Sequence, residues 1–325
     1  TRRSSDLILG MTGQICWNIE NSWFNTFVYD KIAPEPAIVS WMVGVSAAVS
    51  TFCTFLVGTW GDRKGKRKPF ICIGYILWGI FTFIFGATEM IPKNPLFIAA
   101  ACVVLADAVM SFFGSVGNDG GFGPWTTDIS NEHNRGKLGG ALAVMPVFAT
   151  IFGAVVSGLI IDQIDFFAFF GLMGGLVAVV GVMALFTLED SPTLHPKRDE
   201  KGFWHQFLTV FNWETVRGNK ELFWVFLVMT VYFIGFNVYF PYITIYFVNY
   251  LGYDYGMTGI IQGVGLLAAA VMTIPAARFI DKGKAPQVIF TALLCNTAGL
   301  ILVSLSQNLI ILLAGVFGAG IGYIL

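Results

Sequence analysis

Amide side chains recur at helical spacing in the first apolar run of the sequence. They follow one another at intervals of four, three and four residues: Gln14, Asn18, Asn21 and Asn25. This spacing places them along one face of a helix, and Trp17 borders that face. Amides hydrogen-bond hydroxyl groups and an aromatic ring stacks on a sugar ring, so the set suits sugar binding. We predict that the face lines a polar cavity; the alternative is that the amides join neighbouring helices.

Three acids, Glu20, Asp107 and Asp119, lie inside apolar runs. An ionisable group costs about 2.5 to 3.5 kcal/mol at the centre of a membrane helix, so each acid needs a reason to be there. Such a group can carry a coupling cation, H⁺ or Na⁺, and we predict that role for these three. Glu20 lies about 100° from Asn21 around a helix, which favours a place against a neighbouring helix. For Glu20, a neutral acid in a hydrogen bond between helices is an equal alternative.

Asp119 opens a glycine-rich segment that runs to Trp125. Its glycines and its proline predict a loosened helix near the cytoplasmic end of this run. Carbonyl groups freed by such a break, next to a carboxylate, could hold Na⁺, or the acid could carry H⁺. The alternative is that the glycines only allow close helix packing.

A later apolar run, residues 223–249, carries Asn237 and several tyrosines at helical spacing. Pro241 can kink this helix. We predict that Asn237, Tyr239 and Tyr242 form a second side of a sugar site. Tyrosines at this spacing also serve as packing or interface anchors, which is the alternative.

A basic loop at residues 58–69 separates two uncharged runs. Five of its twelve residues are cationic, and such loops remain on the cytoplasmic side of a membrane. A shorter copy occurs at residues 277–286. A carboxylate in this kind of turn can accept the free amides of a helix start, while cations hold the loop at the headgroups. We predict a cytoplasmic gate in which Asp62 and Arg63 hold helices together in one state. Its residues are Gly58, Asp62, Arg63, Gly65, Arg67 and Asp281.

The elements that must position these residues are membrane helices. Of the 325 residues, 56% are apolar and 12% are charged, whereas soluble domains carry about 25% charged residues. Apolar runs of about 18 to 25 residues have the length that crosses a bilayer, so we predict an all-α membrane protein. Ten such runs are expected, at residues 7–30, 38–60, 70–91, 96–120, 138–161, 166–188, 223–249, 256–279, 287–304 and 309–325.

The charges orient these helices. Of the 19 Lys and Arg residues, only Lys31 and Lys93 fall in loops opposite the basic loop. This bias predicts a multi-pass protein of the plasma membrane with its N-terminus and central loop in the cytoplasm. The cysteines show no metal-ligand spacing, and the positive charge is not spread over a surface that would bind nucleic acid. We expect no metal, no nucleic-acid partner, and no cofactor apart from a coupling ion.

A long polar stretch divides the runs into two groups. We predict a six-helix N-terminal bundle at residues 1–188, a cytoplasmic linker at residues 189–222 and a four-helix C-terminal bundle at residues 223–325. The linker contains a short apolar pattern typical of a helix on the membrane surface. Each copy of the basic loop follows the second helix of its half, which indicates two repeats of one plan.

The pattern G-x-x-x-D-R-x-G-x-R-K that begins at Gly58, together with its weaker copy and the six-helix half, resembles the major facilitator superfamily. The resemblance covers the whole chain and implies a two-bundle transporter fold. Members have twelve helices, whereas ten are expected here. The last two helices are therefore expected to be missing from this sequence.

Two further patterns narrow the resemblance. Asp119-x-x-Phe122, followed by Asp128 and Arg135-Gly136, resembles the glycoside-pentoside-hexuronide cation symporters. The segment at residues 13–21 is similar to the sucrose and maltose proton symporters. In the cation symporters the fourth-helix acid belongs to the cation and sugar site, which the resemblance implies for Asp119. Those symporters also use acids in the second helix, whereas residues 38–60 contain none, and this favours H⁺ over Na⁺.

These patterns predict a secondary active transporter, a monomeric cation-coupled symporter of a sugar or glycoside that works by alternating access. The alternatives are a drug or metabolite exporter, a lysolipid carrier of the same superfamily, and a membrane receptor that does not transport. Residues 138–162 lack the G-P-x-x-G-G pattern of exporters, which counts against export. The sequence shows no paired catalytic acids, metal ligands or activated nucleophile, so we do not expect an enzyme.

Overall fold

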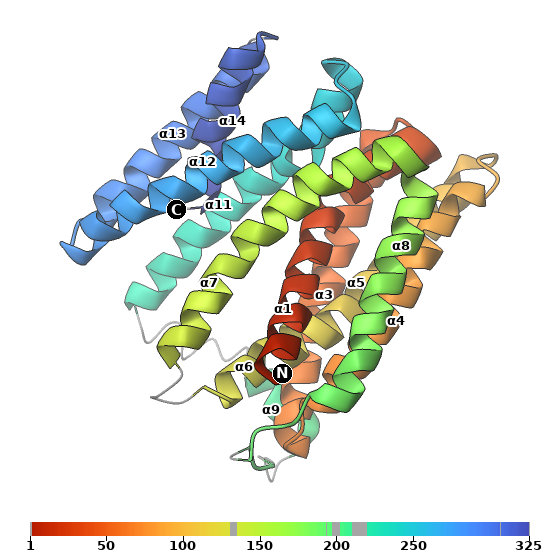
Figure 1. The fold of residues 1–325 in the computed structure, drawn as a ribbon, viewed down its shortest axis with the longest axis vertical. Helices are drawn as coiled ribbons and strands as arrows, with labels where there is room; N and C mark the ends of the chain where they lie inside the picture. The colour runs from red at the N-terminus through yellow and green to blue at the C-terminus, as the bar shows by residue number, and fades with distance from the viewer. Residues whose placement is uncertain are drawn as a thin grey trace. The chain divides into compact units, whose positions relative to one another are not determined.

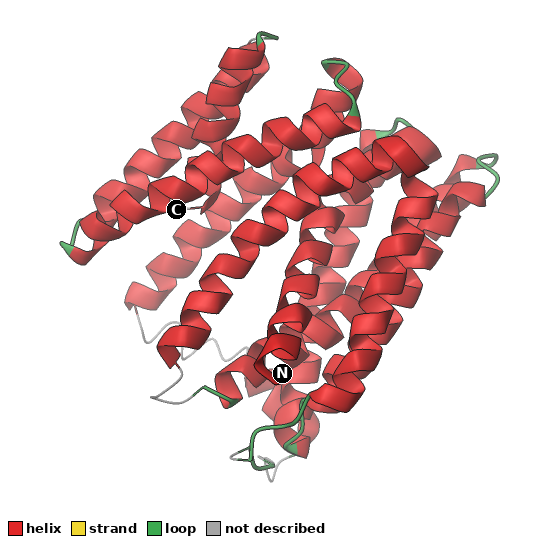
Figure 2. Cartoon of the chain, viewed as in Figure 1, coloured by secondary structure: helices red, strands yellow, loops and turns green. Residues whose placement is uncertain are grey.

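A computed structural model describes residues 2–130, 135–192, 194–196, 202–209, 220–305 and 307–324. Throughout these ranges the regular elements are helices and no strand occurs (Figures 1 and 2). The prediction of an all-α chain is therefore confirmed for the described residues. Parts of the predicted linker, residues 197–201 and 210–219, lie outside them.

The helices follow one another with few long connections. The first predicted run forms one continuous helical segment composed of α1 (Arg2–Ile19), η1 (Glu20–Phe24), α2 (Asn25–Phe27) and η2 (Val28–Ile32). Next come α3 (Pro36–Lys64), α4 (Lys68–Ala87), η3 (Thr88–Met90), α5 (Leu96–Gly117), η4 (Asn118–Phe122) and α6 (Gly123–Asp128). The others are α7 (Arg135–Ile151), η5 (Phe152–Val156), α8 (Ser157–Thr187), α9 (Phe203–Thr209), α11 (Lys220–Ile245), η6 (Tyr246–Tyr250), α12 (Tyr255–Asp281), α13 (Ala285–Leu305) and α14 (Leu309–Ile324). Apart from the 3₁₀ turn η3, the η segments are π-helical turns.

Seven helical stretches among the described residues are long and apolar enough to cross a membrane. The stretch at residues 138–187 includes two of the predicted runs. They are separated at Asp165, whose backbone leaves the helical region with φ 66° and ψ 166°. Leu309–Gly322 is a shorter apolar helix. Apolar side chains such as Trp224, Val231 and Val238 are exposed on α11, as expected of a helix surface that faces lipid.

Contacts divide the chain into two compact units. The first contains residues 1–13, 23–142 and 166–243. In this unit α5 packs against both α3 and α4, and glycine permits the closest approach, since a side chain at Gly74 would overlap the backbone of Gly117. Aromatic rings fill the space between α4 and the chain around residue 25; Phe24 stacks on Phe85 with ring centroids 4.2 Å apart.

The second unit contains residues 14–22, 143–165 and 244–325. Here α14 packs against α12 and α13, and Ala269, Ala292 and Ile321 form a buried cluster between these helices. The turn η5 packs against α12, where a side chain at Gly259 would overlap the carbonyl of Ala154. Both units draw on segments of both predicted bundles, so the division at residues 189–222 stays a prediction.

Candidate functional site

A cavity of about 470 Å³ lies within the second unit. Its polar lining consists of Gln14 and Asn18 from α1, Thr150 from α7 and Thr273 from α12. The remaining lining is apolar and consists of Pro146, Val147, Ile151, Leu266, Leu267 and Ala270. None of these described lining residues is charged. The cavity therefore offers amides and hydroxyls in an apolar surround, which suits a neutral hydroxylated ligand.

Local structure brings the polar groups to the cavity. Gln14 and Asn18 are one helical turn apart on α1, and the Asn18 amide donates to the Gln14 carbonyl at 3.2 Å. Gly153 makes room for Asn18, because a Cβ at residue 153 would lie 2.6 Å from the Asn18 Cβ. Thr150 donates to the Pro146 carbonyl at 2.9 Å, and Thr273 to the Ala270 carbonyl at 2.7 Å. With their protons used within the helices, both hydroxyls remain available as acceptors.

The other residues of the predicted amide face do not line this cavity. Trp17 and Asn21 are near it in sequence, but the Asn21 amide donates to the Trp17 carbonyl at 2.8 Å. Asn25 is 3% exposed and belongs to the first unit. The π-helical turn η1 lies between Asn18 and Asn25 and holds more residues per turn than an α-helix. The face that the 3.6-residue period predicts is therefore not maintained beyond residue 20.

The predicted residues of α11 are not among the lining residues of the cavity and belong to the first unit. The Asn237 amide donates to the Phe233 carbonyl of its own helix at 2.8 Å, and the Tyr239 ring packs on Phe236. Tyr242 reaches the start of α3, where its hydroxyl donates to the Pro36 carbonyl at 3.0 Å. These contacts favour the alternative, in which Asn237, Tyr239 and Tyr242 serve in helix packing.

The three acids occupy different surroundings. Asp107 lies on α5 and is 2% exposed; its Oδ2 accepts a hydrogen bond from Ser46 on α3. Asp119 lies in η4, directly after α5, and accepts hydrogen bonds from Ser115 and from Asn118, both at 3.0 Å. Glu20 opens η1, is half-buried and does not line the cavity.

Asp119 belongs to a hydrogen-bond network that reaches α1. The Asn118 amide oxygen accepts from the Tyr75 hydroxyl at 3.1 Å, and that hydroxyl also lies 3.0 Å from the Leu9 carbonyl. Gly13 allows this approach, since a Cβ there would lie 2.5 Å from the Tyr75 hydroxyl. The predicted loosening after Asp119 takes the form of a π-helical turn rather than a break.

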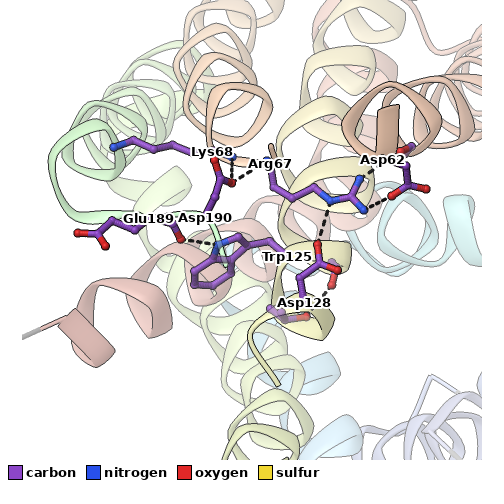
Figure 3. Close-up of polar contacts among 10 residues, drawn as sticks. Asp62, Arg67, Lys68, Trp125, Asp128, Glu189 and Asp190 are labelled. Carbon is purple, nitrogen blue, oxygen red and sulfur yellow. Dashed lines mark hydrogen bonds and ion pairs between the residues drawn. The ribbon is translucent and has the colours of Figure 1, made fainter. Parts of the chain in front are cut away.

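Arg67 is the centre of a polar cluster at the basic loop (Figure 3). Its side chain is 5% exposed. The guanidinium donates to Asp62 on α3, to Asp128 at 3.1 Å and to the Gly58 carbonyl at 3.1 Å. Two carboxylates and a carbonyl thus compensate the buried charge, and the several N–H donors of the guanidinium allow it to bond all three.

The same cluster binds the segment that follows α8. Asp190 accepts from the backbone amides of Arg67 and Lys68 at 2.7 and 2.8 Å, and so caps the start of α4. The Trp125 indole donates to the Glu189 carbonyl at 2.9 Å (Figure 3). The cluster therefore joins α3, α4, α6 and the end of the first six predicted helices.

Asp62 and Arg63, the two residues predicted to hold helices together, have different partners. Arg67 bonds Asp62, whereas Arg63 donates to Gln206 of α9 at 3.1 Å. This arrangement depends on the turn at Gly65. Gly65 follows the last residue of α3 and has a left-handed backbone conformation with φ 62°, so the chain reverses direction there. Arg67 then returns across Gly61, where a Cβ would lie 3.3 Å from its Cδ and Cζ atoms.

The second copy of the basic loop lacks this arrangement in the part of the chain that the structure describes. Asp281 is the last residue of α12, is exposed and has no ion pair there. Asp190, Thr150 and Thr273 were not predicted from the sequence. Asp190 could have been found, because it follows the sixth apolar run on the same side as the basic loop. The two threonines are isolated hydroxyls in apolar runs and carry no such signal.

The sequence profile of the Major Facilitator Superfamily matches residues 8–325. The chain belongs to this superfamily. The superfamily and its solved relatives are transporters, so the chain is a multi-pass membrane transporter and not an enzyme. Curated protein sequences yield no match. The resemblance to the glycoside and sucrose or maltose symporters stays a prediction.

Solved structures of superfamily transporters share the fold. A nucleoside transporter, NupG, is 12% identical, with 98% of this chain and 80% of that chain covered and a TM-score of 0.72. A D-xylose-proton symporter is 16% identical, with 99% and 81% covered and a TM-score of 0.61. The xylose transporter XylE from E. coli, in a partially occluded inward open conformation, is 14% identical, with 100% and 85% covered and a TM-score of 0.64.

Proposed function

We propose that this transporter is a symporter that couples the uptake of a neutral sugar or glycoside to a cation, with H⁺ favoured over Na⁺. The observation that carries the proposal is the cavity beside α1, whose described lining has two amides and two hydroxyls and no charged side chain. Its volume of about 470 Å³ is within the usual range of small-molecule sites. Sugar hydroxyls can pair with amides as donors and with threonine oxygens as acceptors.

The absence of charge from the described lining residues also separates the candidate ligands. A lysolipid phosphate or a cationic drug would be desolvated in this cavity without an opposite charge, which is unfavourable. A nucleoside is neutral and hydroxylated, and the nucleoside transporter has a higher TM-score than either of the two xylose transporters. Nucleoside transport is therefore the second candidate.

The coupling ion is proposed from the sequence and from one relative. Residues 38–60 contain no acid that could extend a Na⁺ site, and the D-xylose-proton symporter is named for proton coupling. The acids available for coupling are Glu20, Asp107 and Asp119. We place the basic loop and the N-terminus in the cytoplasm of a plasma-membrane monomer, with alternating access by the two predicted bundles and the Arg67 cluster at the cytoplasmic gate.

Uptake by the full-length protein in proteoliposomes tests this proposal. The probes are labelled D-xylose, D-glucose, sucrose, maltose and uridine, each with an inward H⁺ gradient, an inward Na⁺ gradient or no gradient. We expect at least one sugar to accumulate in response to the H⁺ gradient, because symport uses the downhill ion to concentrate the sugar. Acceleration of none of the sugars by either ion would overturn the proposal, and accumulation of uridine alone would establish the second candidate.

A further inference from the structure

Asp107 is a buried carboxyl near the centre of a membrane helix. It is 11 residues after Leu96, the first residue of α5, and a rise of 1.5 Å per residue places it about 16 Å along the helix. That is about half of a hydrocarbon thickness of roughly 30 Å. The side chain is 2% exposed. Asp107 is therefore an acid at the depth where transporters of this kind hold their coupling ions.

Only one of the two carboxyl oxygens of Asp107 has a donor in the described part of the chain. Ser46 of α3 donates to Oδ2, whereas Oδ1 is buried and has no hydrogen-bond partner. No ion pair among the described residues includes Asp107. An ionised carboxylate would be an uncompensated buried charge there. A protonated carboxyl is neutral and suits this surround, because one oxygen then carries a proton.

The elements packed against α5 are α3, α4, η2, η3 and η4. In the described residues, none of their titratable side chains is hydrogen-bonded or ion-paired to Asp107. Lys31 and Glu89 pair with each other at 3.4 Å. The titratable residues on these elements are Cys53, Asp62, Arg63, Lys64, Lys68, Cys72, Tyr75, Tyr29, Asp30, Lys31, Glu89 and Asp119.

Asp119 differs from Asp107 in depth and in bonding. It lies 23 residues after Leu96, or about 34 Å along the helix, near the cytoplasmic end of the predicted span. Both of its oxygens have a donor, from Ser115 and Asn118. These bonds fit a structural role in the network around η4.

Glu20 and Glu89 each also have one buried oxygen that accepts no hydrogen bond, but both side chains are only half-buried, and Glu89 pairs with Lys31. Among the described acids, Asp107 is the one that combines near-complete burial with such an oxygen.

We propose that Asp107 is the proton-binding carboxyl of the transport cycle and that Ser46 is its positioning residue; this assignment rests on the proposed function. Oδ1 takes a proton from a hydronium ion on one side, so that an O–H bond of the hydronium breaks as the carboxyl O–H bond forms. On the other side the carboxyl O–H bond breaks and the proton returns to water. When Asp107 is protonated, α3 and α5 can pack against each other around it. When Asp107 is ionised, a conformation in which water reaches the carboxylate is favoured. A hard metal cation needs several oxygen ligands, whereas one hydrogen-bond donor, Ser46, reaches this acid among the described residues; the proposed ligand is therefore H⁺.

Infrared difference spectra between acid and alkaline pH test proton binding without a substrate. The reconstituted full-length protein and its Asp107→Asn and Asp119→Asn variants are compared. We expect a carboxylic-acid C=O band that appears on acidification, that is lost in Asp107→Asn and that remains in Asp119→Asn. A band lost in Asp119→Asn but kept in Asp107→Asn would overturn the assignment, as would the absence of any band that changes with pH.

Ser46→Ala tests the positioning role. Its hydroxyl donates to the carboxylate and stabilises the ionised form, so we expect the midpoint of the same band to move to higher pH. The matched control is Thr82→Val, a buried hydroxyl on α4 that bonds the Trp78 carbonyl of its own helix. An unmoved midpoint in Ser46→Ala, or an equal movement in Thr82→Val, would contradict the positioning role.

Transport separates this assignment from the proposed function. With the sugar that accumulates in the panel above, we expect Asp107→Asn to lose accumulation driven by the H⁺ gradient and to retain counterflow of that sugar. Accumulation that persists in Asp107→Asn would overturn the assignment but leave the symport proposal intact. If the unmodified protein moves no sugar, the proposed function fails, and the infrared spectra still decide whether Asp107 binds a proton.

Discussion

Replacing Asn18 with leucine is expected to weaken sugar binding. Leucine has a similar volume but offers no hydrogen bond, so one sugar hydroxyl loses its partner in a largely apolar cavity. Such a loss costs about 1 to 3 kcal/mol, which corresponds to a decrease in affinity of about 5-fold to 150-fold. Titration calorimetry with the sugar that the uptake panel identifies measures the effect, and Gln14→Leu is expected to give a change of the same order.

The matched control for Asn18→Leu is Asn237→Leu. The amide of Asn237 donates to its own helix and lies outside the cavity, so affinity should stay within about twofold of the unmodified protein. The sequence alone assigned both residues to sugar binding, whereas the structure separates them. A loss of affinity in Asn237→Leu with none in Asn18→Leu would refute the assignment of the cavity.

Replacing Arg67 with glutamine is expected to produce the largest loss of stability. The change removes the buried guanidinium and leaves Asp62 and Asp128 without their cation. Breaking a buried pair costs about 3 to 5 kcal/mol, and we expect about 3 kcal/mol because the Asp62 side chain is 43% exposed. The thermal midpoint of the detergent-solubilised protein measures this loss. Lys66→Gln removes an exposed charge from the same loop and should change stability by less than about 0.5 kcal/mol.

Two glycines on α3 give an independent check of the Arg67 position. A Cβ at Gly61 would overlap the guanidinium, whereas a Cβ at Gly58 has no neighbour within 4 Å. Gly61→Ala should therefore destabilise the protein by about 1 to 3 kcal/mol through overpacking. Gly58→Ala should be neutral or slightly stabilising, since alanine favours a helix. Equal effects of the two changes would show that Arg67 does not cross Gly61.

The fold class was predictable because a membrane helix can be recognised from a few properties of its sequence. Length and apolarity predict the spans, and the bias of Lys and Arg predicts their orientation. The residues at which individual helices begin and end were less predictable. Asp165 separates two apolar runs by a single residue with φ 66°, and no glycine or proline marks that position in the sequence.

The site was only partly predictable. Gln14 and Asn18, two of the four amides on the predicted face, are among the residues that line the cavity. The predicted face assumes an α-helical period, which η1 does not keep. Thr150 and Thr273 come from α7 and α12, helices far apart in the sequence. The contact of Arg67 with Asp62 depends on the direction of the chain after Gly65. These features arise from tertiary geometry, which a periodic pattern does not contain.

Sugar-induced proton movement tests the symport proposal most directly. The full-length protein is reconstituted in lightly buffered proteoliposomes without an imposed gradient, and the pH of the medium is followed as D-xylose, sucrose or maltose is added. Proton symport predicts that a transported sugar makes the medium more alkaline and that a protonophore abolishes the change. Uptake of a labelled sugar with no change in the pH of the medium would contradict it.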